Sequence, residues 1–476
     1  MVSRGSVLAT IVLASMMFAG VPAKATTYYV AKTGNDANAC SQVSPCLTIS
    51  HAYSLASPGD VVSVGAGTYS ESLSLNRAGS SSSSITVQGY SVGGACPTTA
   101  QTDVVSPVNT RPNPTVNINS ATLSAAYNTL DCFRLTSSGL SVTASNTRAV
   151  NNYVDGNSMS SSGNTGVLVG GYGVLPGPAN VYLGHNYVTL MEYGMWIQAS
   201  NSLFELNEVN GFKYSGTAGD CDYNRIWGDT LTFRHNYYHG FDGSTMCVAA
   251  QPHVDCWQTY YGTGNEYSRN HVFDGNTCKS FNEGFMASDT GGSAGDMSNW
   301  TVVNNVFDVG SMGPWCGVFD AHNFTVTYKN NTCYGGLVVS RDSWGSGGAH
   351  LTATNNIFYL PGWYAQDNCN YHAETGGSVS GSTNNIDYDP GYSLSCNAGD
   401  QQNVNPDFVS PGTDYHLQSG SPAIGAATNV GLTTDHDGNP RPSGGGYDIG
   451  AYQFTVGTGT AKGPTPPSGV AIVAIH

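Results

Sequence analysis

An asparagine recurs along this chain at intervals of 21 to 35 residues, each time followed two residues later by an apolar or aromatic residue. A recurrence at this period indicates a solenoid, in which each repeat forms one coil that stacks on its neighbours. Stacked coils place equivalent Asn side chains roughly 4.8 Å apart, so that their amides can form a hydrogen-bonded ladder at one turn. The expected ladder residues are Asn152, Asn186, Asn207, Asn236, Asn270, Asn305, Asn331 and Asn356.

The composition agrees with strands and turns rather than helices. Charged residues make up only 10% of the chain, against about 25% in typical domains, and there are 60 glycines. Helices use Glu and Lys freely, whereas strands and tight turns do not need them. The chain is therefore predicted to be all-β, with one elongated domain and a continuous core.

The N-terminus resembles a secretory signal peptide spanning residues 1–25. Arg4 precedes an apolar stretch at 7–20 that is too short to span a bilayer, and Ala23-Lys24-Ala25 fits a cleavage site. Export would leave 14 basic against 32 acidic residues. So acidic a chain is unsuited to nucleic acid or anionic membranes. Residues 455–476 resemble a Gly/Pro-rich linker, which could lead to a cell-surface tether.

All 12 cysteines follow this signal segment, an even number that suggests disulfides in an exported chain. The close pair Cys40 and Cys46 is the first expected bridge. No cysteine or histidine cluster has the spacing of zinc ligands, so we predict no metal framework.

Two segments near the ends carry a family resemblance. Residues 27–30 and 61–64 are expected strands around an amphipathic helix at 45–56, followed by Gly65-Ala66-Gly67-Thr68-Tyr69. Near the other end are Asn405-Pro406-Asp407-Phe408 and Asp448-Ile449-Gly450-Ala451-Tyr452. These runs resemble the two ends of secreted right-handed parallel β-helix proteins of the pectate-lyase-like superfamily.

The resemblance implies a single-stranded right-handed parallel β-helix over residues 26–454, with an N-terminal helical cap (26–76) and a C-terminal capping segment (403–454). It implies a monomer with a polysaccharide as substrate or ligand. It is weak evidence for any one activity, because the superfamily includes lyases, hydrolases, epimerases and proteins of no known activity.

Uneven coil lengths predict a groove. The long intervals lie between Asn152 and Asn186 and between Asn207 and Asn305, well above the roughly 20 to 25 residues of a minimal coil. Extra residues in consecutive coils usually emerge on one side. We expect the segments 211–228, 240–252 and 274–282 to form the walls, although they could equally decorate the surface.

A second strand recurs after the Asn turn, and its second position is always apolar: Met195, Cys256, Phe285, Val318 and Leu337. If that position faces the core, strand alternation turns its neighbours outward. His253, Asp255 and Trp257 would then stand in one outward row. Trp196, Met286 and Phe319 would lie beside Trp257 as a platform for sugar rings, unless they pack under the long loops.

His253 and Asp255 are the central catalytic candidates, because a carboxylate can orient an imidazole for proton transfer. Arg225 could pair with a uronate carboxylate or form a structural salt bridge with Asp220 or Asp222. Glu283 completes the catalytic set. The predicted substrate-binding residues are Trp257, Trp196, Gln258, Asp222 and Asp289.

Several alternatives stay open at this stage. β-Elimination would need Arg225 or a bound calcium ion to neutralise a uronate, whereas hydrolysis would need two carboxylates around the bond. The run Asp435-His436-Asp437-Gly438-Asn439 resembles a calcium loop, but a turn with an Arg441–Asp448 pair fits it better. No cofactor is indicated with certainty. The rival hypothesis is a non-catalytic surface protein that binds glycan.

Overall fold

The computed structural model of the protein describes residues 25–455 with internal gaps. The gaps fall at 160–164, 174, 214–220, 243–246, 248–252, 261–265, 290–295, 311–312, 344–346, 361–368 and 443–445. The predicted signal peptide up to residue 24 and the tail from residue 456 therefore lie outside the described residues. No helix in the described ranges is long and apolar enough to cross a membrane.

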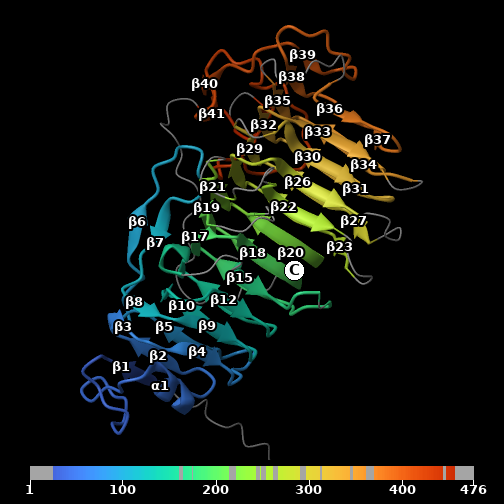
Figure 1. The fold of residues 1–476 in the computed structure, drawn as a ribbon. Helices are drawn as coiled ribbons and strands as arrows, with labels where there is room; N and C mark the ends of the chain where they lie inside the picture. The colour runs from blue at the N-terminus through green and yellow to red at the C-terminus, as the bar shows by residue number, and fades with distance from the viewer. Residues whose placement is uncertain are drawn as a thin grey trace, which may run out of the picture.

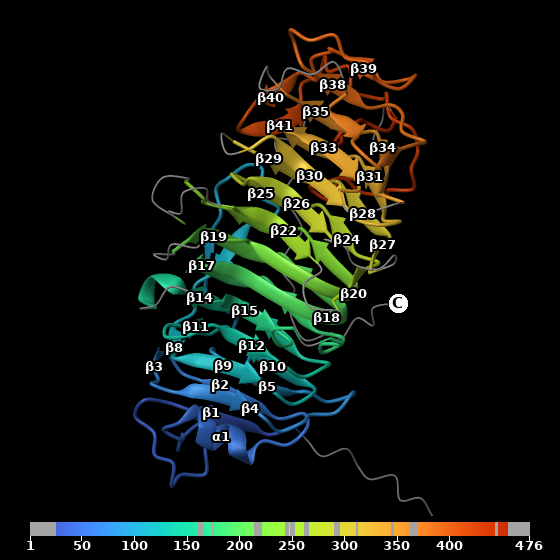
Figure 2. The same cartoon turned by 45° about the vertical axis from the view of Figure 1, so that its right-hand side comes forward.

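The strands form three parallel faces that wind around one core, which confirms the predicted parallel β-helix (Figures 1 and 2). Each coil contributes a strand to face 3, then face 2, then face 1. Faces 1 and 2 belong to one hydrogen-bonded sheet, because β18 (Tyr193–Glu205) and β20 (Asn224–Arg234) continue across the corner between them. The first half of each long strand lies in face 2 and the second half in face 1.

Face 1 consists of the second halves of β18 and β20 together with β1 (Thr27–Val30), β2 (Val61–Val64), β5 (Ile85–Gln88), β10 (Asn128–Asp131), β13 (Arg148–Val150), β16 (Tyr182–Gly184), β24 (Val272–Asp274), β28 (Trp300–Val303), β31 (Thr325–Lys329), β34 (His350–Thr354) and β37 (Ser378–Val379). The short strands β23 (Ser268–Arg269) and β27 (Met297–Ser298) pair at its corner with face 2.

Face 2 consists of the first halves of β18 and β20 together with β4 (Ser72–Leu75), β9 (Ser120–Leu123), β12 (Leu140–Val142), β15 (Thr165–Val169), β22 (Asp255–Tyr260), β26 (Glu283–Ser288), β30 (Trp315–Asp320), β33 (Leu337–Arg341) and β36 (Tyr371–Ala373).

Face 3 is a separate sheet of β3 (Gly67–Thr68), β8 (Val116–Ile118), β11 (Arg134–Leu135), β14 (Tyr153–Asp155), β17 (Tyr187–Met191), β19 (Glu208–Phe212), β21 (Tyr237–His239), β25 (Thr277–Lys279), β29 (Val306–Asp308), β32 (Thr332–Tyr334), β35 (Ile357–Tyr359), β38 (Ile386–Tyr388) and β39 (Gln401–Gln402).

A buried Asn ladder runs along the corner between faces 1 and 3. In each step the side-chain amide of one Asn donates to the side-chain oxygen of the next, for example Asn207 to Asn236 at 3.0 Å and Asn305 to Asn331 at 3.0 Å. Each amide also donates to a main-chain carbonyl, and each side-chain oxygen accepts a main-chain N–H of the coil below. The ladder therefore satisfies polar groups that the turn buries.

One predicted ladder residue is wrong. Asn276, not Asn270, occupies the step between Asn236 and Asn305, with both side-chain contacts at 2.9 Å. Asn270 lies in a different, exposed row of turn residues and contacts Asp229 and Asn299. Asn385 extends the buried ladder by one further step beyond Asn356.

A short helix, α1 (Ile49–Leu55), lies at the N-terminal end against β1, β2 and β4 (Figure 1). It is shorter than the predicted 45–56. It begins at Ile49 because the Glu71 carboxylate accepts the main-chain N–H groups of Ile49 and Ser50, and Thr48 caps the first turn.

The outer side of face 3 is covered along much of its length by two other segments of the chain. The antiparallel hairpin of β6 (Thr98–Ala100) and β7 (Thr110–Pro112) runs beside β17, β19 and β21 (Figure 1). Its Arg111 pairs with Glu208, and Asp103 pairs with Lys279 at 3.0 Å. A C-terminal segment with β40 (Phe408–Ser410) and β41 (Asp414–Leu417) packs on Val306, Ile357 and Ile386. The strands contacted by these two segments all belong to face 3.

The described residues contain six disulfides, and the predicted Cys40–Cys46 bridge is confirmed. The others are Cys96–Cys132, Cys221–Cys247, Cys256–Cys278, Cys316–Cys333 and Cys369–Cys396. Two of them brace the coils around residues 221–278, where the candidate site lies.

Candidate functional site

Polar side chains gather on face 2 where three consecutive strands begin. Asp222 stands just before β20, His253 just before β22, and Glu283 is the first residue of β26. Asp255 and Glu283 are register partners in neighbouring coils. Main-chain bonds fix this edge: the N–H of Cys221 donates to the His253 carbonyl at 3.0 Å, and the N–H of Tyr223 donates to that of Asp255 at 2.9 Å.

The His253 imidazole lies between two carboxylates. Its Nδ1 is 3.1 Å from Oδ2 of Asp255, and its Nε2 is 3.9 Å from Oε1 of Glu283. The Asp255 side chain has no solvent exposure, whereas His253 is 37% and Glu283 18% exposed. A buried carboxylate on Nδ1 orients the ring, so Nε2 is the nitrogen that can exchange a proton with a ligand.

Asn282 was not predicted, yet it holds this part of the site. The N–H of Val254 donates to the Asn282 side-chain oxygen at 2.8 Å, and the N–H of Asn282 donates to the Val254 carbonyl at 2.7 Å. This reciprocal pair fixes the residue between His253 and Asp255 relative to Glu283. Its position immediately before a predicted catalytic carboxylate is the one sequence signal that pointed to it.

Arg225 forms the structural salt bridge considered in the sequence analysis. Its Nε lies 2.7 Å from Oδ2 of Asp222, and its side chain is 7% exposed. The other oxygen of Asp222 accepts the main-chain N–H of Asp255 at 3.1 Å. Asp222 therefore links the cation to the strand that carries the imidazole, and is fully buried rather than placed to touch a substrate.

Aromatic rings surround the Arg225 guanidinium, which lies 4.4 Å from the Tyr193 ring centre, 5.2 Å from Trp196 and 5.8 Å from Tyr260. Trp196 and Arg225 are register partners, as are Arg225 and Gln258. Trp196 and Gln258 thus point outward on the same row as Arg225, as their predicted role requires. Tyr193 and Tyr260 were missed, although both stand close in sequence to residues that were singled out.

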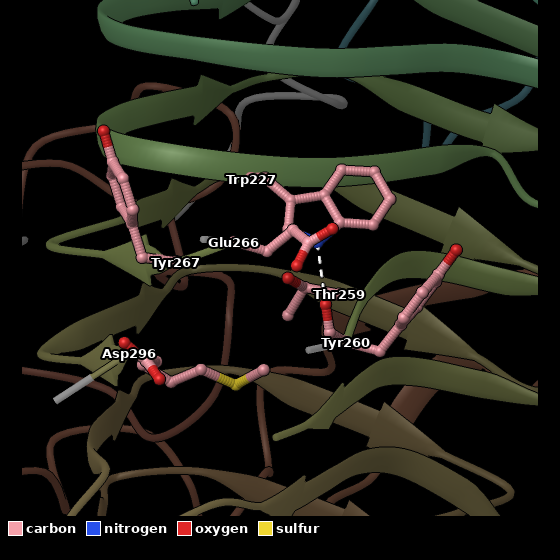
Figure 3. Close-up of a pocket in the computed structure, with 7 residues that line it drawn as sticks. Trp227, Thr259, Tyr260, Glu266, Tyr267 and Asp296 are labelled. Carbon is pink, nitrogen blue, oxygen red and sulfur yellow. Dashed lines mark hydrogen bonds between the residues drawn. The ribbon is translucent and has the colours of Figure 1, made fainter. Parts of the chain in front are cut away.

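Trp227 lines a small hollow near the corner where β20 passes from face 2 to face 1. It is lined by Trp227, Thr259, Tyr260, Glu266, Tyr267, Asp296 and Met297 (Figure 3). The indole Nε1 donates to the Tyr260 carbonyl at 2.8 Å, which is the dashed line in Figure 3. Trp227 also packs on Trp196, with ring centres 5.1 Å apart. Trp227 itself is only 2% exposed, so it supports Trp196 from beneath and does not extend the aromatic surface.

The predicted outward position of Trp257 is wrong. Trp257 is fully buried, stacks on Phe285 with ring centres 5.0 Å apart, and is the register partner of that residue. The recurring strand pattern equates Cys256 with Phe285, one residue away from the observed register. A slip of one residue moves every side chain of a strand to the opposite face. Matching the acids Asp255 and Glu283 would have given the observed register.

The same slip affects the neighbouring coils. Met286 is the register partner of the outward residue Gln258 and points outward as expected. Phe319 was also expected to point outward, but it is fully buried in the core. Val318 and Leu337 were predicted to face the core. They instead form a small separate cluster with Val339 and Leu360, against which Trp315 packs.

The predicted groove walls are only partly described. Most of 211–221 and 240–252 lies outside the described residues, while 224–228 is part of β20. The segment 274–282 is not a wall, because it contains the buried ladder residue Asn276 and strand β25.

Asp289 lies at the opposite end of β26 from Glu283, so the structure does not bring it to His253. Its Oδ2 instead accepts from Nδ1 of His322 at 2.6 Å, and Nε2 of His322 is 3.9 Å from Asp342. The Asp289 hydrogen bond raises the pKa of His322. This second cluster joins successive coils at the corner between faces 2 and 1.

Two groups of residues bear on the calcium alternative. Asp222, His253 and Asp255 each offer a ligand atom within 4.8 Å of the others, so they could hold a divalent cation. In the run 435–439, the Asp435 carboxylate accepts main-chain N–H groups of Asp437 and Asn439. Arg441 donates to the carbonyls of Asp448 and Gly450. A turn, as favoured from the sequence, accounts for these contacts.

No protein-family model and no curated protein sequence matches the chain. Among solved structures, the pectate lyase Pel9A is 16% identical, with a TM-score of 0.51 over 92% of this chain and 98% of that one. XylC, in a complex with xylose, is 10% identical, with a TM-score of 0.50 over 90% of this chain and 98% of that one. At these identities, the chain shares with them the parallel β-helix fold.

Proposed function

We propose that the protein is an exported enzyme that cleaves a polysaccharide bound along face 2, with His253 as the proton-transferring group. One observation carries this proposal: the imidazole is held on Nδ1 by the buried carboxylate of Asp255 and keeps Nε2 toward the exposed side. Similarity to a pectate lyase and to a protein crystallised with xylose supports a sugar polymer as the ligand.

The outward residues of face 2 near His253 are of the types that bind a sugar chain. Trp196, Tyr193 and Tyr260 offer aromatic surface around Arg225, and Gln258 adds an amide on the same row. Aromatic rings pack on the apolar faces of sugars, while amides bond their hydroxyls. The chain would run along the solenoid axis and cross the edge where His253 lies.

Elimination fits the site better than hydrolysis. Hydrolysis by two carboxylates needs both in reach of the bond. Asp222 and Asp255 are fully buried, and Asp289 is at the other end of its strand. Glu283 alone combines partial exposure with contact to His253. In an elimination, Nε2 of His253 would accept the proton next to a sugar carboxyl group, a C=C bond would form as the C–O bond breaks, and the leaving oxygen would take a proton from water.

The sugar carboxyl group would need its charge balanced for that step. Arg225 is already paired with Asp222, so it can contribute only as part of that ion pair. A divalent cation held by Asp222, His253 and Asp255 is the other source of charge, although it would compete for the imidazole. A sugar whose carboxyl group is a neutral ester would need neither Arg225 nor a divalent cation.

Export is proposed from three observations together: the predicted signal peptide, the acidic composition and the six disulfides. Non-catalytic glycan binding is the second candidate function. The partly exposed rings of Trp196, Tyr193 and Tyr260 around Arg225 favour it, since binding needs these rings and not His253.

The first prediction separates these functions on a panel of pectin, alginate and neutral glycans. Wild-type protein should generate absorbance near 235 nm, the mark of the unsaturated uronate that elimination produces. His253→Ala should lose about 10²–10⁴-fold in rate, because the proton acceptor is gone. Because His253→Ala also removes a partner of the fully buried Asp255 carboxylate, the free energy of unfolding of the variant should fall by about 1–3 kcal/mol.

Thr325→Ala is a matched control, since it alters an exposed polar residue of face 1 and should keep full activity. Reducing ends without new absorbance would indicate hydrolysis. Binding without turnover of any polymer would leave the non-catalytic function.

A further inference from the structure

We propose a second carbohydrate-binding site on face 3, in a hollow lined by Tyr153, Asn157, Tyr187, Thr189, Leu190, Asn210 and Gly211. We call it the Tyr153–Tyr187 hollow, and it encloses about 310 Å³. It lies on β14, β17 and β19, on a different face from His253. Its ligand would be an uncharged sugar unit of a polysaccharide.

Elsewhere on face 3, outward tyrosines hold segments of the chain itself. Tyr237 donates to Asp103 of the β6–β7 hairpin. Tyr334 and Tyr359 pack against Tyr415 and Phe408 of the C-terminal segment. Aromatic residues on this face are therefore docking positions. Tyr153 and Tyr187 are register partners of the same kind, but the described part of the chain leaves both partly exposed.

The Tyr153 and Tyr187 rings lie against each other, and the Asn157 and Asn210 side chains line the same hollow. Their centres are 4.9 Å apart at an interplanar angle of 39°. Asn210 donates its side-chain amide to the Tyr187 hydroxyl at 3.0 Å, which fixes that ring. Asn157 is exposed at the rim, where its amide can bond a sugar hydroxyl. Aromatic surface beside amides is the usual composition of a sugar site.

The charges around the hollow argue for a neutral ligand. Arg134 lies 4.6 Å from the Tyr153 ring centre and is paired with Asp155. Arg111 lies 5.1 Å from that of Tyr187 and is paired with Glu208. Each cation thus has its own carboxylate, so no net charge is directed at the ligand. An anionic sugar would gain little from two neutralised guanidinium groups.

The test is electrophoresis in native gels that contain a soluble neutral polysaccharide, with xylan, galactan and β-glucan tested separately and alginate as the anionic comparison. The wild-type protein should be retarded by at least one neutral polymer more than by alginate. Tyr153→Ala and Tyr187→Ala should each weaken this retardation about tenfold. Tyr388→Ala, which removes an outward ring of face 3 away from the hollow, should not.

A folding defect must be distinguished from a binding defect. Asn157→Trp leaves both tyrosines in place and fills the hollow from its exposed rim, so it should abolish retardation without lowering the melting temperature. Retardation that persists in Asn157→Trp, or that alginate matches in the wild type, would overturn the proposal. So would a wild-type protein that no neutral polymer retards.

The proposed catalytic site on face 2 and the proposed binding site on face 3 can be tested independently of each other. His253→Ala should keep full retardation while losing turnover. Tyr187→Ala should keep turnover on short oligosaccharides, because these do not need a second attachment point. A variant of the hollow that lost turnover on short oligosaccharides would also contradict the assignment.

Discussion

His253 depends on a carboxylate that solvent does not reach. Asp255 has no exposed side-chain surface, and its Oδ2 lies 3.1 Å from Nδ1 of the imidazole. A buried carboxylate of this kind fixes the tautomer and the direction of the ring, so that the proton is exchanged at Nε2. If the proposed chemistry is correct, removing only the charge of Asp255 should impair catalysis while the shape of the site stays unchanged.

We therefore predict that Asp255→Asn lowers kcat on the active polymer about 10²-fold or more, with little change in KM. Asp222→Asn is the matched comparison, because Asp222 is equally buried but holds Arg225 instead of His253. It should raise KM more than it lowers kcat. Equal losses of kcat in both variants would mean that the two aspartates serve the fold and not the imidazole.

At this scale the sequence identified most of the polar residues of the site but not their orientations. His253, Asp255 and Glu283 do come together, and so do Arg225 and Asp222. The predicted outward position of Trp257 was wrong because the direction of a strand side chain depends on the register of the strand, which the neighbouring coil sets. A local pattern of one apolar residue cannot fix it.

Among the structural elements, the Asn ladder shows which part of the pattern carries information. Asn270 lies 34 residues after Asn236 and fits the expected interval of 21 to 35, whereas Asn276 lies 40 residues after it, although both are followed two residues later by an apolar or sulfur-containing residue. Only Asn276 is buried, in a corner where a main-chain carbonyl and two neighbouring Asn residues satisfy its amide. The spacing of the Asn residues predicted that a ladder exists, whereas burial determines that Asn276 and not Asn270 belongs to it.

This distinction gives a paired prediction. Asn276→Ala should lower the unfolding free energy by about 1–3 kcal/mol, because it leaves buried partners in two coils without their hydrogen bonds. Asn270→Ala removes an exposed amide six residues away and should change it by less than about 0.5 kcal/mol. Urea unfolding of the two variants checks this. Similar losses would imply that the exposed row contributes as much as the buried ladder.

For the whole molecule, the least predictable feature is the covering of face 3. It depends on contacts between residues far apart in sequence, such as Asp103 with Lys279 and Thr277 with both Val105 and His436. No periodic pattern marks such pairs. Their consequence is functional, since they occupy much of one face and leave face 2 and the Tyr153–Tyr187 hollow accessible to ligands.

Two parts of the C-terminal segment are joined through the partly buried imidazole of His416. His416 lies between Asp414, at 2.6 Å from Nδ1, and Asp437, at 2.9 Å from Nε2. Burial opposes the charged imidazole, but the hydrogen bonds to the two carboxylates outweigh it and raise the pKa of His416 to about 10. His235 and His271 show the opposite effect, because burial lowers the pKa of each to about 3.

These shifts imply a stability profile with a maximum near neutral pH. The contribution of His416 is complete below its unfolded pKa of about 6.5 and is lost as the pH rises toward 10. The contribution of His235 and His271 is complete above about 6.5 and is lost as the pH falls toward 3, because the unfolded chain then binds protons that the folded chain excludes.

The alkaline side gives the sharper test. Between pH 7 and 9 the unfolding free energy should fall by about 1.4 kcal/mol per pH unit through His416 alone, since one proton is released on unfolding. His416→Gln should be less stable at neutral pH but should flatten this slope, whereas His51→Gln, on helix α1, should keep it. Urea unfolding at each pH measures the slope. A His416→Gln slope as steep as that of the wild type would show that the contacts of His416 with Asp414 and Asp437 are not what limits stability in alkali.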